Sequence, residues 1–180
     1  SKNKYATVMF EDLFPSKGDM DMNDVVFGLN IEYQMNYLSK VTAIVINIQP
    51  RAIGGSYEKI GIAANFSSST ALNIIDYITY SNGPELGALF AITNSSGKYS
   101  PEPNANSQVV PLTGDYRSYF DNNKDLFLNV RNIDPSTKTH VFSSTIKFKS
   151  ADTRYYSEFT FLETTITGKI NLDIFTVFNE

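Results

Sequence analysis

The chain of 180 residues lacks cysteine and tryptophan and contains a single histidine, His140. Without cysteine the protein has neither disulfides nor thiolate metal ligands, and one histidine makes a zinc site or a catalytic triad improbable. Lysine and arginine total 15, the formal net charge is −4, and no basic run occurs. Because nucleic-acid binding requires a clustered basic surface, this composition argues against a nucleic-acid partner.

Long apolar runs are also missing. No segment reaches the ~20 apolar residues that span a bilayer, and the chain does not begin with a charged and hydrophobic signal sequence. We therefore expect no transmembrane segment in this chain, and we expect any export signal or lipid anchor to lie outside it.

What the sequence does contain is alternating hydrophobicity. From Val25 to Met35 every second residue is large and apolar, which is the period of a half-buried strand. Residues Asn36 to Lys40 form a predicted turn into a second strand from Val41 to Gln49, in which Ile44, Ile46 and Ile48 share one face. These segments predict a long antiparallel hairpin that ends at Pro50, because proline cannot donate to a strand ladder.

Further strand patterns recur every 8 to 15 residues with no alternating helices. The predicted strands are Ile60 to Phe66, Leu86 to Thr93, Ser107 to Leu112, Leu126 to Asn132, His140 to Lys149, Tyr155 to Leu162 and Lys169 to Phe178. Residues Ala71 to Tyr80 are compatible with either a helix or a strand. We predict an all-β chain folded as an antiparallel, jelly-roll-like β-sandwich, with residues 1–180 forming one domain of a larger exported protein.

The residues from Phe10 to Asp24 are the most informative segment, since they hold five carboxylates and one amide oxygen among fifteen residues. Asp19, Asp21 and Asn23 recur at alternate positions, the spacing at which a tight loop directs oxygen ligands at a calcium ion. A solvated acidic turn is the alternative, but carboxylates held close together repel one another unless a cation compensates.

The EF-hand pattern is met only in its first half, because positions six and twelve counted from Asp19 are Asp24 and Asn30 instead of glycine and glutamate. The segment therefore predicts a calcium-type acidic loop between the first two strands. Side chains of Asp19, Asp21 and Asn23 are its expected ligands, together with a backbone carbonyl and a carboxylate from Asp24, Glu11 or Asp12. Calcium is preferred to magnesium because many flexible oxygen ligands suit the larger ion.

The run Phe10-Glu11-Asp12-Leu13-Phe14-Pro15, followed by Gly18-Asp19, Asp21 and Asn23-Asp24, resembles the signature of the LruC domain family. That family usually has tryptophan where this chain has Phe14. The resemblance covers about the first 60 residues. It implies an exported domain of a bacterial surface lipoprotein or secreted protein, with an extracellular or outer-membrane location and no implied reaction. The residues it carries over are Glu11, Asp12, Asp19, Asp21, Asn23 and Asp24.

Two classes of function agree with these features. We favour a non-catalytic calcium-binding module that takes part in adhesion to a surface glycan or a host protein, with tyrosines as stacking platforms. The tyrosines considered are Tyr77, Tyr80, Tyr99, Tyr116, Tyr119, Tyr155 and Tyr156. The alternative is a glycoside hydrolase that uses paired carboxylates. It is disfavoured because the adjacent Glu11 and Asp12 would point to opposite faces of a strand.

Overall fold

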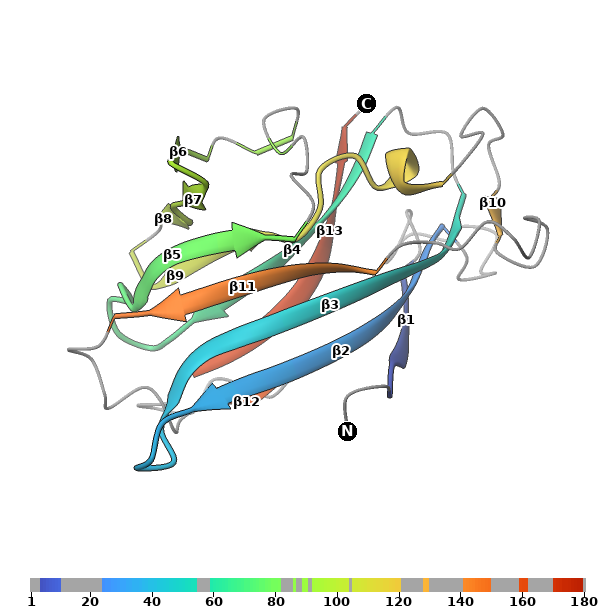
Figure 1. Cartoon of the computed structure of the whole chain (residues 1–180). Coiled ribbons are helices and arrows are strands. Elements are labelled where there is room, and N and C mark those ends of the chain that lie inside the picture. Colours follow the sequence, from blue (N-terminus) through green and yellow to red (C-terminus); the bar gives the residue numbers. More distant parts are fainter. Residues whose placement is uncertain are drawn as a thin grey trace.

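In a computed structural model the chain folds into two β-sheets (Figure 1). The structure describes residues 4–10, 24–54, 59–81, 86, 89–90, 92–103, 105–120, 128–129, 141–149, 159–161 and 170–179. A short 3₁₀ helix, η2 (Tyr116–Tyr119), accompanies the strands. No helix within these ranges is long and apolar enough to cross a membrane.

The larger sheet contains eight strands, and every described pair in it is antiparallel. Its order is β1 (Ala6–Phe10), β2 (Val25–Met35), β3 (Val41–Ile53), β11 (Phe142–Phe148), β5 (Ile75–Tyr80), β7 (Lys98–Tyr99) and β6 (Asn94–Ser95), and β10 (Leu128–Asn129) also pairs with β3.

The smaller sheet has five strands in the order β12 (Phe159–Phe161), β13 (Ile170–Asn179), β4 (Lys59–Ser67), β9 (Ser107–Pro111) and β8 (Glu102–Pro103). Its pairs are antiparallel except β12 with β13, which run parallel.

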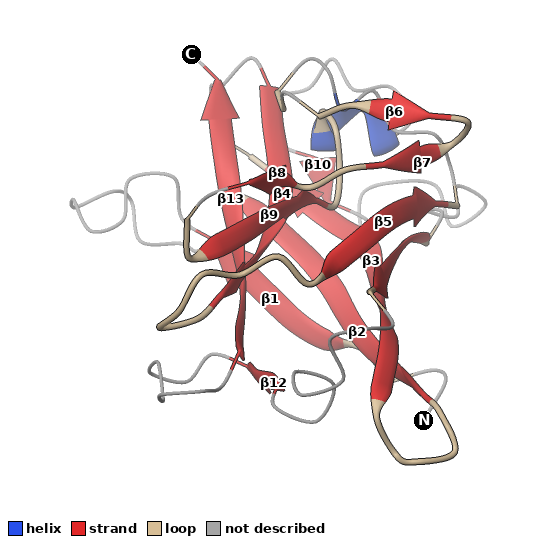
Figure 2. Ribbon diagram, turned by 90° about the vertical axis from the view of Figure 1, so that its left-hand side faces the viewer, coloured by secondary structure: helices blue, strands red, loops and turns tan. Residues whose placement is uncertain are grey.

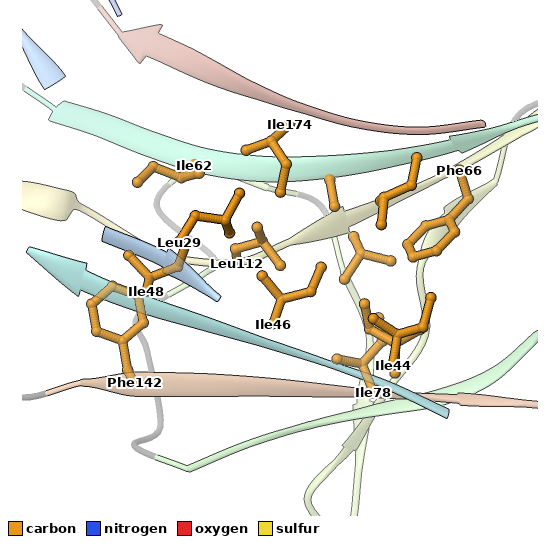
Figure 3. Close-up of a cluster of buried hydrophobic side chains, with 14 of the residues drawn as sticks. Leu29, Ile44, Ile46, Ile48, Ile62, Phe66, Ile78, Leu112, Phe142 and Ile174 are labelled. Carbon is orange, nitrogen blue, oxygen red and sulfur yellow. The ribbon is translucent and has the colours of Figure 1, made fainter. Parts of the chain in front are cut away.

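The hydrophobic core lies between the two sheets. Ile44, Ile46 and Ile48 of β3 point from the larger sheet toward Ile62 and Phe66 of β4 (Figure 3), and all five are fully buried. Residues of both sheets belong to one cluster of buried side chains. An all-β fold of two sheets around a shared core is consistent with the predicted β-sandwich.

The predicted hairpin is confirmed. β2 and β3 pair along their whole length, from Val25 with Ile53 to Met35 with Val41. Val25, Phe27 and Leu29 are buried, as the alternation predicted, whereas Tyr33 and Met35 at the far end of β2 are exposed. β2 therefore extends beyond the core it helps to form.

Pro50 does not end β3, so that prediction was wrong. The strand continues to Ile53, and Pro50 pairs with Phe27 at a shift of register in the ladder with β2. On the other side of β3, β11 pairs only as far as Ile48, and β10 pairs only with Ala52 and Ile53. Proline is tolerated there because it lies at an irregularity, in a gap between two partners.

The other predicted strands have mixed outcomes. Strands β4, β9, β11 and β13 confirm the predictions for those regions, and the ambiguous residues 71–80 contain the strand β5. In β11 the buried residues alternate as expected. The prediction of a strand from Leu86 to Thr93 was wrong for its described residues, where Leu89 and Phe90 donate backbone hydrogen bonds to the carbonyl of Leu86 in a turn. Only residues 128–129 and 159–161 are described as strands in the regions predicted at 126–132 and 155–162.

Candidate metal centre

The acidic segment connects two strands that lie side by side. β1 pairs antiparallel with β2, and the last residue of β1, Phe10, is the register partner of the first residue of β2, Val25. The chain therefore leaves and re-enters the sheet at adjacent positions, and residues 11–24 close this connection. The predicted ligands Glu11, Asp12, Asp19, Asp21 and Asn23 lie outside the described residues, so their role as ligands stays a prediction.

Asp24 is the one predicted ligand that the structure describes. Only 6% of its surface is exposed, and its backbone carbonyl accepts a hydrogen bond of 2.8 Å from the amide of Gly54. A carboxylate removed from water to this extent requires hydrogen-bond donors or a cation beside it. Asp24 thus places a buried acidic group at the point where the acidic segment enters β2.

A β-bulge lies two residues further along. Val26 pairs with Ala52 and Phe27 pairs with Pro50, which leaves Arg51 as an extra residue in β3. The hydroxyl group of Tyr116 accepts a hydrogen bond of 3.3 Å from the Arg51 amide and donates one of 2.8 Å to the Val26 carbonyl. One side chain from η2 therefore satisfies backbone groups of both strands at the irregularity.

The helix that carries Tyr116 is itself anchored. Asp115 caps η2, since its side chain accepts a hydrogen bond from the Arg117 amide. The Arg117 guanidinium donates a longer bond, 3.5 Å, to the carbonyl of Gly54, the residue whose amide binds Asp24. These contacts link η2 to the base of the acidic segment.

Arg51 also connects β3 to β1 across the intervening strand. Its Nη1 donates to the hydroxyl of Thr7, whose register partner in β2 is Gly28. A Cβ atom on Gly28 would lie 3.1 Å from the Arg51 guanidinium and 3.1 Å from Cβ of Tyr5. Glycine at this position leaves room for the arginine side chain to pass over β2. We call the Arg51–Thr7 hydrogen bond the Arg51 strap; it fixes β1, the strand that leads into the acidic segment.

Sequence reasoning missed this supporting structure, because Gly114-Asp115-Tyr116 has the composition of an ordinary turn. Tyr116 cannot be the stacking platform for a ligand that the sequence suggested, since its side chain is fully buried. Burial raises the pKa of its hydroxyl well above the usual value. The bulge that the Tyr116 hydroxyl bonds to has no local sequence signal, because a bulge arises from the pairing of two strands and not from either strand alone.

The other candidate tyrosines fall into three groups. Tyr80, Tyr99 and Tyr119 are partly buried against the core, and the Tyr80 hydroxyl donates to the carbonyl of Pro111 at 2.6 Å. Tyr77 lies under a lysine, with Nζ of Lys98 4.2 Å from its ring centroid. Tyr155 and Tyr156, like His140, lie outside the described residues.

Within the described ranges no group of three or more histidine, cysteine, aspartate or glutamate residues is placed to hold a metal ion. Comparisons with protein-family models, curated proteins and solved structures found no match to this chain. The resemblance to the LruC domain therefore stays an expectation based on the residues of the acidic segment.

Proposed function

We propose that the protein is a non-catalytic calcium-binding module of an exported bacterial surface protein. The observation that supports this most directly is that the acidic segment joins two paired strands and ends in a buried aspartate, Asp24. A cation bound by this segment would cross-link the start of β2 to the end of β1. In this proposal the sandwich has jelly-roll connectivity and is stabilised by the ion.

The ligand set follows from the chemistry of the segment. Asp19, Asp21 and Asn23 supply side-chain oxygens at alternate positions, and Asp24, Glu11 or Asp12 completes the set with a carboxylate. A bound calcium ion would supply positive charge that offsets the repulsion among these acids. The chain's own contribution is to hold the two ends of the segment at adjacent strands, through the Arg51 strap and the Tyr116 bonds at the bulge.

The proposed role of the module is adhesion to a glycan or to another protein. Support for this part comes from the resemblance to surface proteins and from a sheet surface that carries polar residues. On the side of the larger sheet away from the core, the half-buried residues Asn30, Glu32 and Ser143 surround the buried Asn47. Asn47 donates hydrogen bonds to Asn30 and Glu32, and Ser143 donates to Asn47. In Figure 1 this sheet faces the viewer and no labelled strand crosses it.

Calcium binding is tested by isothermal titration calorimetry together with thermal unfolding in calcium or excess chelator. At a calcium concentration of about 100 times the dissociation constant, binding stabilises the folded state by about 2.7 kcal/mol. For a chain of this size that corresponds to a rise in Tm of about 5 to 11 °C.

Asp21→Ala removes one expected ligand and should abolish both the binding heat and the shift in Tm. Asp76→Ala, at an exposed aspartate of β5, is the matched control and should leave both unchanged. Identical melting curves for the unmodified protein in calcium and in chelator, with no binding heat, would refute the proposal.

A further inference from the structure

The turn between β2 and β3 carries an unusual concentration of exposed apolar side chains. Six large hydrophobic residues are exposed in the described part of the chain, and four of them fall between residues 33 and 38. Their exposed fractions are 40% for Tyr33, 59% for Met35, 92% for Tyr37 and 60% for Leu38. We call residues 33–40 the hairpin tip. Single exposed hydrophobics are ordinary, but a cluster of them marks an interaction surface.

The hairpin tip has a defined conformation. The Asn36 side-chain oxygen accepts hydrogen bonds from the amides of Leu38, at 2.9 Å, and Lys40, at 3.0 Å. The Asn36 amide donates to the Lys40 carbonyl, and Ser39 adopts a positive φ of 58°. Tyr37 and Leu38 are thus held at the apex of an ordered turn, so little conformational entropy is lost when they are buried by a partner.

The tip projects away from the rest of the molecule. Figure 1 shows it at the lower left, beyond the ends of the neighbouring strands, and Figure 2 shows the same turn in tan at the bottom. The acidic segment enters β2 at the opposite end, and the part of that strand before the tip, residues 25–32, separates the two by about 27 Å.

Charge distinguishes the tip from the remainder of the chain. The sequence has a net charge of −4, yet residues 33–54 contain no aspartate or glutamate, and the tip itself holds one charged residue, Lys40. Lys147 of β11 also lies toward this end of the sheet, opposite Ala43 of β3. Glu32 comes just before the tip, where its carboxylate accepts a hydrogen bond from Asn47, and the exposed Asp76 lies on β5 beside Tyr77, the register partner of Lys147. An anionic surface therefore meets a lysine without a carboxylate only where it contacts the tip itself.

We propose that the hairpin tip inserts into the interfacial region of a phospholipid bilayer. The tip is convex and narrow, and a fluid bilayer accepts such a shape without a preformed pocket. Tyr37 has the amphipathic ring that favours the headgroup region, Leu38 and Met35 supply apolar area, and Lys40 is placed to meet phosphate groups. This inference is independent of calcium binding, because the two sites lie at opposite ends of β2.

The absence of tryptophan allows a direct test. Tyr37→Trp introduces a single fluorescent reporter at the apex, and Met9→Trp places one on β1, at a residue that is 50% exposed and far along the sheet from the tip. Each variant is titrated with vesicles of phosphatidylcholine alone and of phosphatidylcholine mixed equally with phosphatidylglycerol. We expect a blue shift of the emission at position 37, stronger with the anionic vesicles, and none at position 9.

Vesicle sedimentation with serine variants supplies the second measurement. Met35 and Met9 are the same residue type with similar exposure, so Met35→Ser should weaken binding about tenfold while Met9→Ser leaves it unchanged. Thermal unfolding of each variant verifies that the fold is intact.

Three outcomes would overturn the proposal. They are neither sedimentation with vesicles nor a blue shift at position 37, equal losses for the two serine variants, or binding that high salt abolishes while the emission stays unshifted. The first would leave a protein pocket as the partner for the tip, and the last would mean surface adsorption through lysines. Calcium titration of the same samples keeps this result separate from that of the proposed calcium site.

Discussion

Replacing Tyr116 by phenylalanine tests whether one hydroxyl group holds the β-bulge at the base of the acidic segment. The substitution keeps the ring and its edge contacts with Phe27 and Phe120, at centroid distances of 6.4 Å and 5.5 Å. It removes the acceptor for the Arg51 amide and the donor to the Val26 carbonyl. The effect of the substitution is therefore confined to two hydrogen bonds.

The expected loss of stability follows from those two bonds. A buried backbone group left without a partner costs about 1 to 3 kcal/mol, and the two groups here are only partly buried, so we take the lower end for each. The free energy of unfolding should fall by about 2 kcal/mol in total, which lowers Tm by about 4 to 8 °C in a chain of this length.

Urea unfolding followed by circular dichroism measures the loss, and hydrogen exchange locates it. The Arg51 amide should exchange faster in Tyr116→Phe, whereas amides of β4 should be unaffected until global unfolding. Tyr37→Phe is the matched control, because that hydroxyl is on a side chain that is 92% exposed, and it should change stability by less than about 0.5 kcal/mol. A loss in Tyr116→Phe as small as that of the control would show that the bulge does not depend on the hydroxyl.

Two further predictions concern ionisation and the turn. Burial raises the pKa of Tyr119 to about 12 and raises those of Tyr80 and Tyr116 further, so the folded state holds these protons more tightly than the unfolded state. Their contribution to the free energy of unfolding is complete below the unfolded pKa of about 10 and declines as the pH rises above it. Denaturant unfolding at a series of alkaline pH values should show this decline. A constant free energy of unfolding from pH 9 to about 12 would contradict it. Asn36→Ala removes the acceptor for two amides of the turn and should lower stability by about 1 kcal/mol. It should also speed hydrogen exchange at Leu38, and unchanged exchange there would mean that the side chain does not order the turn.

Local pattern predicted the β2–β3 hairpin and the inward face of β11, because side chains alternate across a strand with a period of two wherever one face is buried. Asn36 to Lys40 was also recognisable as a turn from its residue types. The prediction failed at Pro50, where an irregular ladder between β2 and β3 accepts a proline that the sequence rule excludes. It failed again at Leu86 to Thr93, where apolar residues pack without forming a strand in the part that is described. These side chains pack against Gly61, since a Cβ atom on that residue would lie 2.9 Å from Leu89 and 3.0 Å from Phe90.

The candidate site was likewise predictable from the sequence only in part. Its proposed ligand chemistry comes from the sequence alone, because the oxygen-bearing residues Asp19, Asp21 and Asn23 stand at alternate positions of one short segment. The residues that support it were not readable, since Arg51, Gly54 and Tyr116 reach the base of the acidic segment from other elements.

The sequence by itself determined that the chain is built of strands, which faces of them are apolar, and that one acidic segment near the amino end concentrates oxygen-bearing side chains. All of these properties arise from neighbouring residues. Only the tertiary structure decided that β11 lies between β3 and β5, that Arg51 straps β1 to β3 across Gly28, and that Tyr116 fills a bulge 90 residues away. These pairings depend on how distant segments pack around a common core, and periodicity within a single strand carries no information about which partner it will meet.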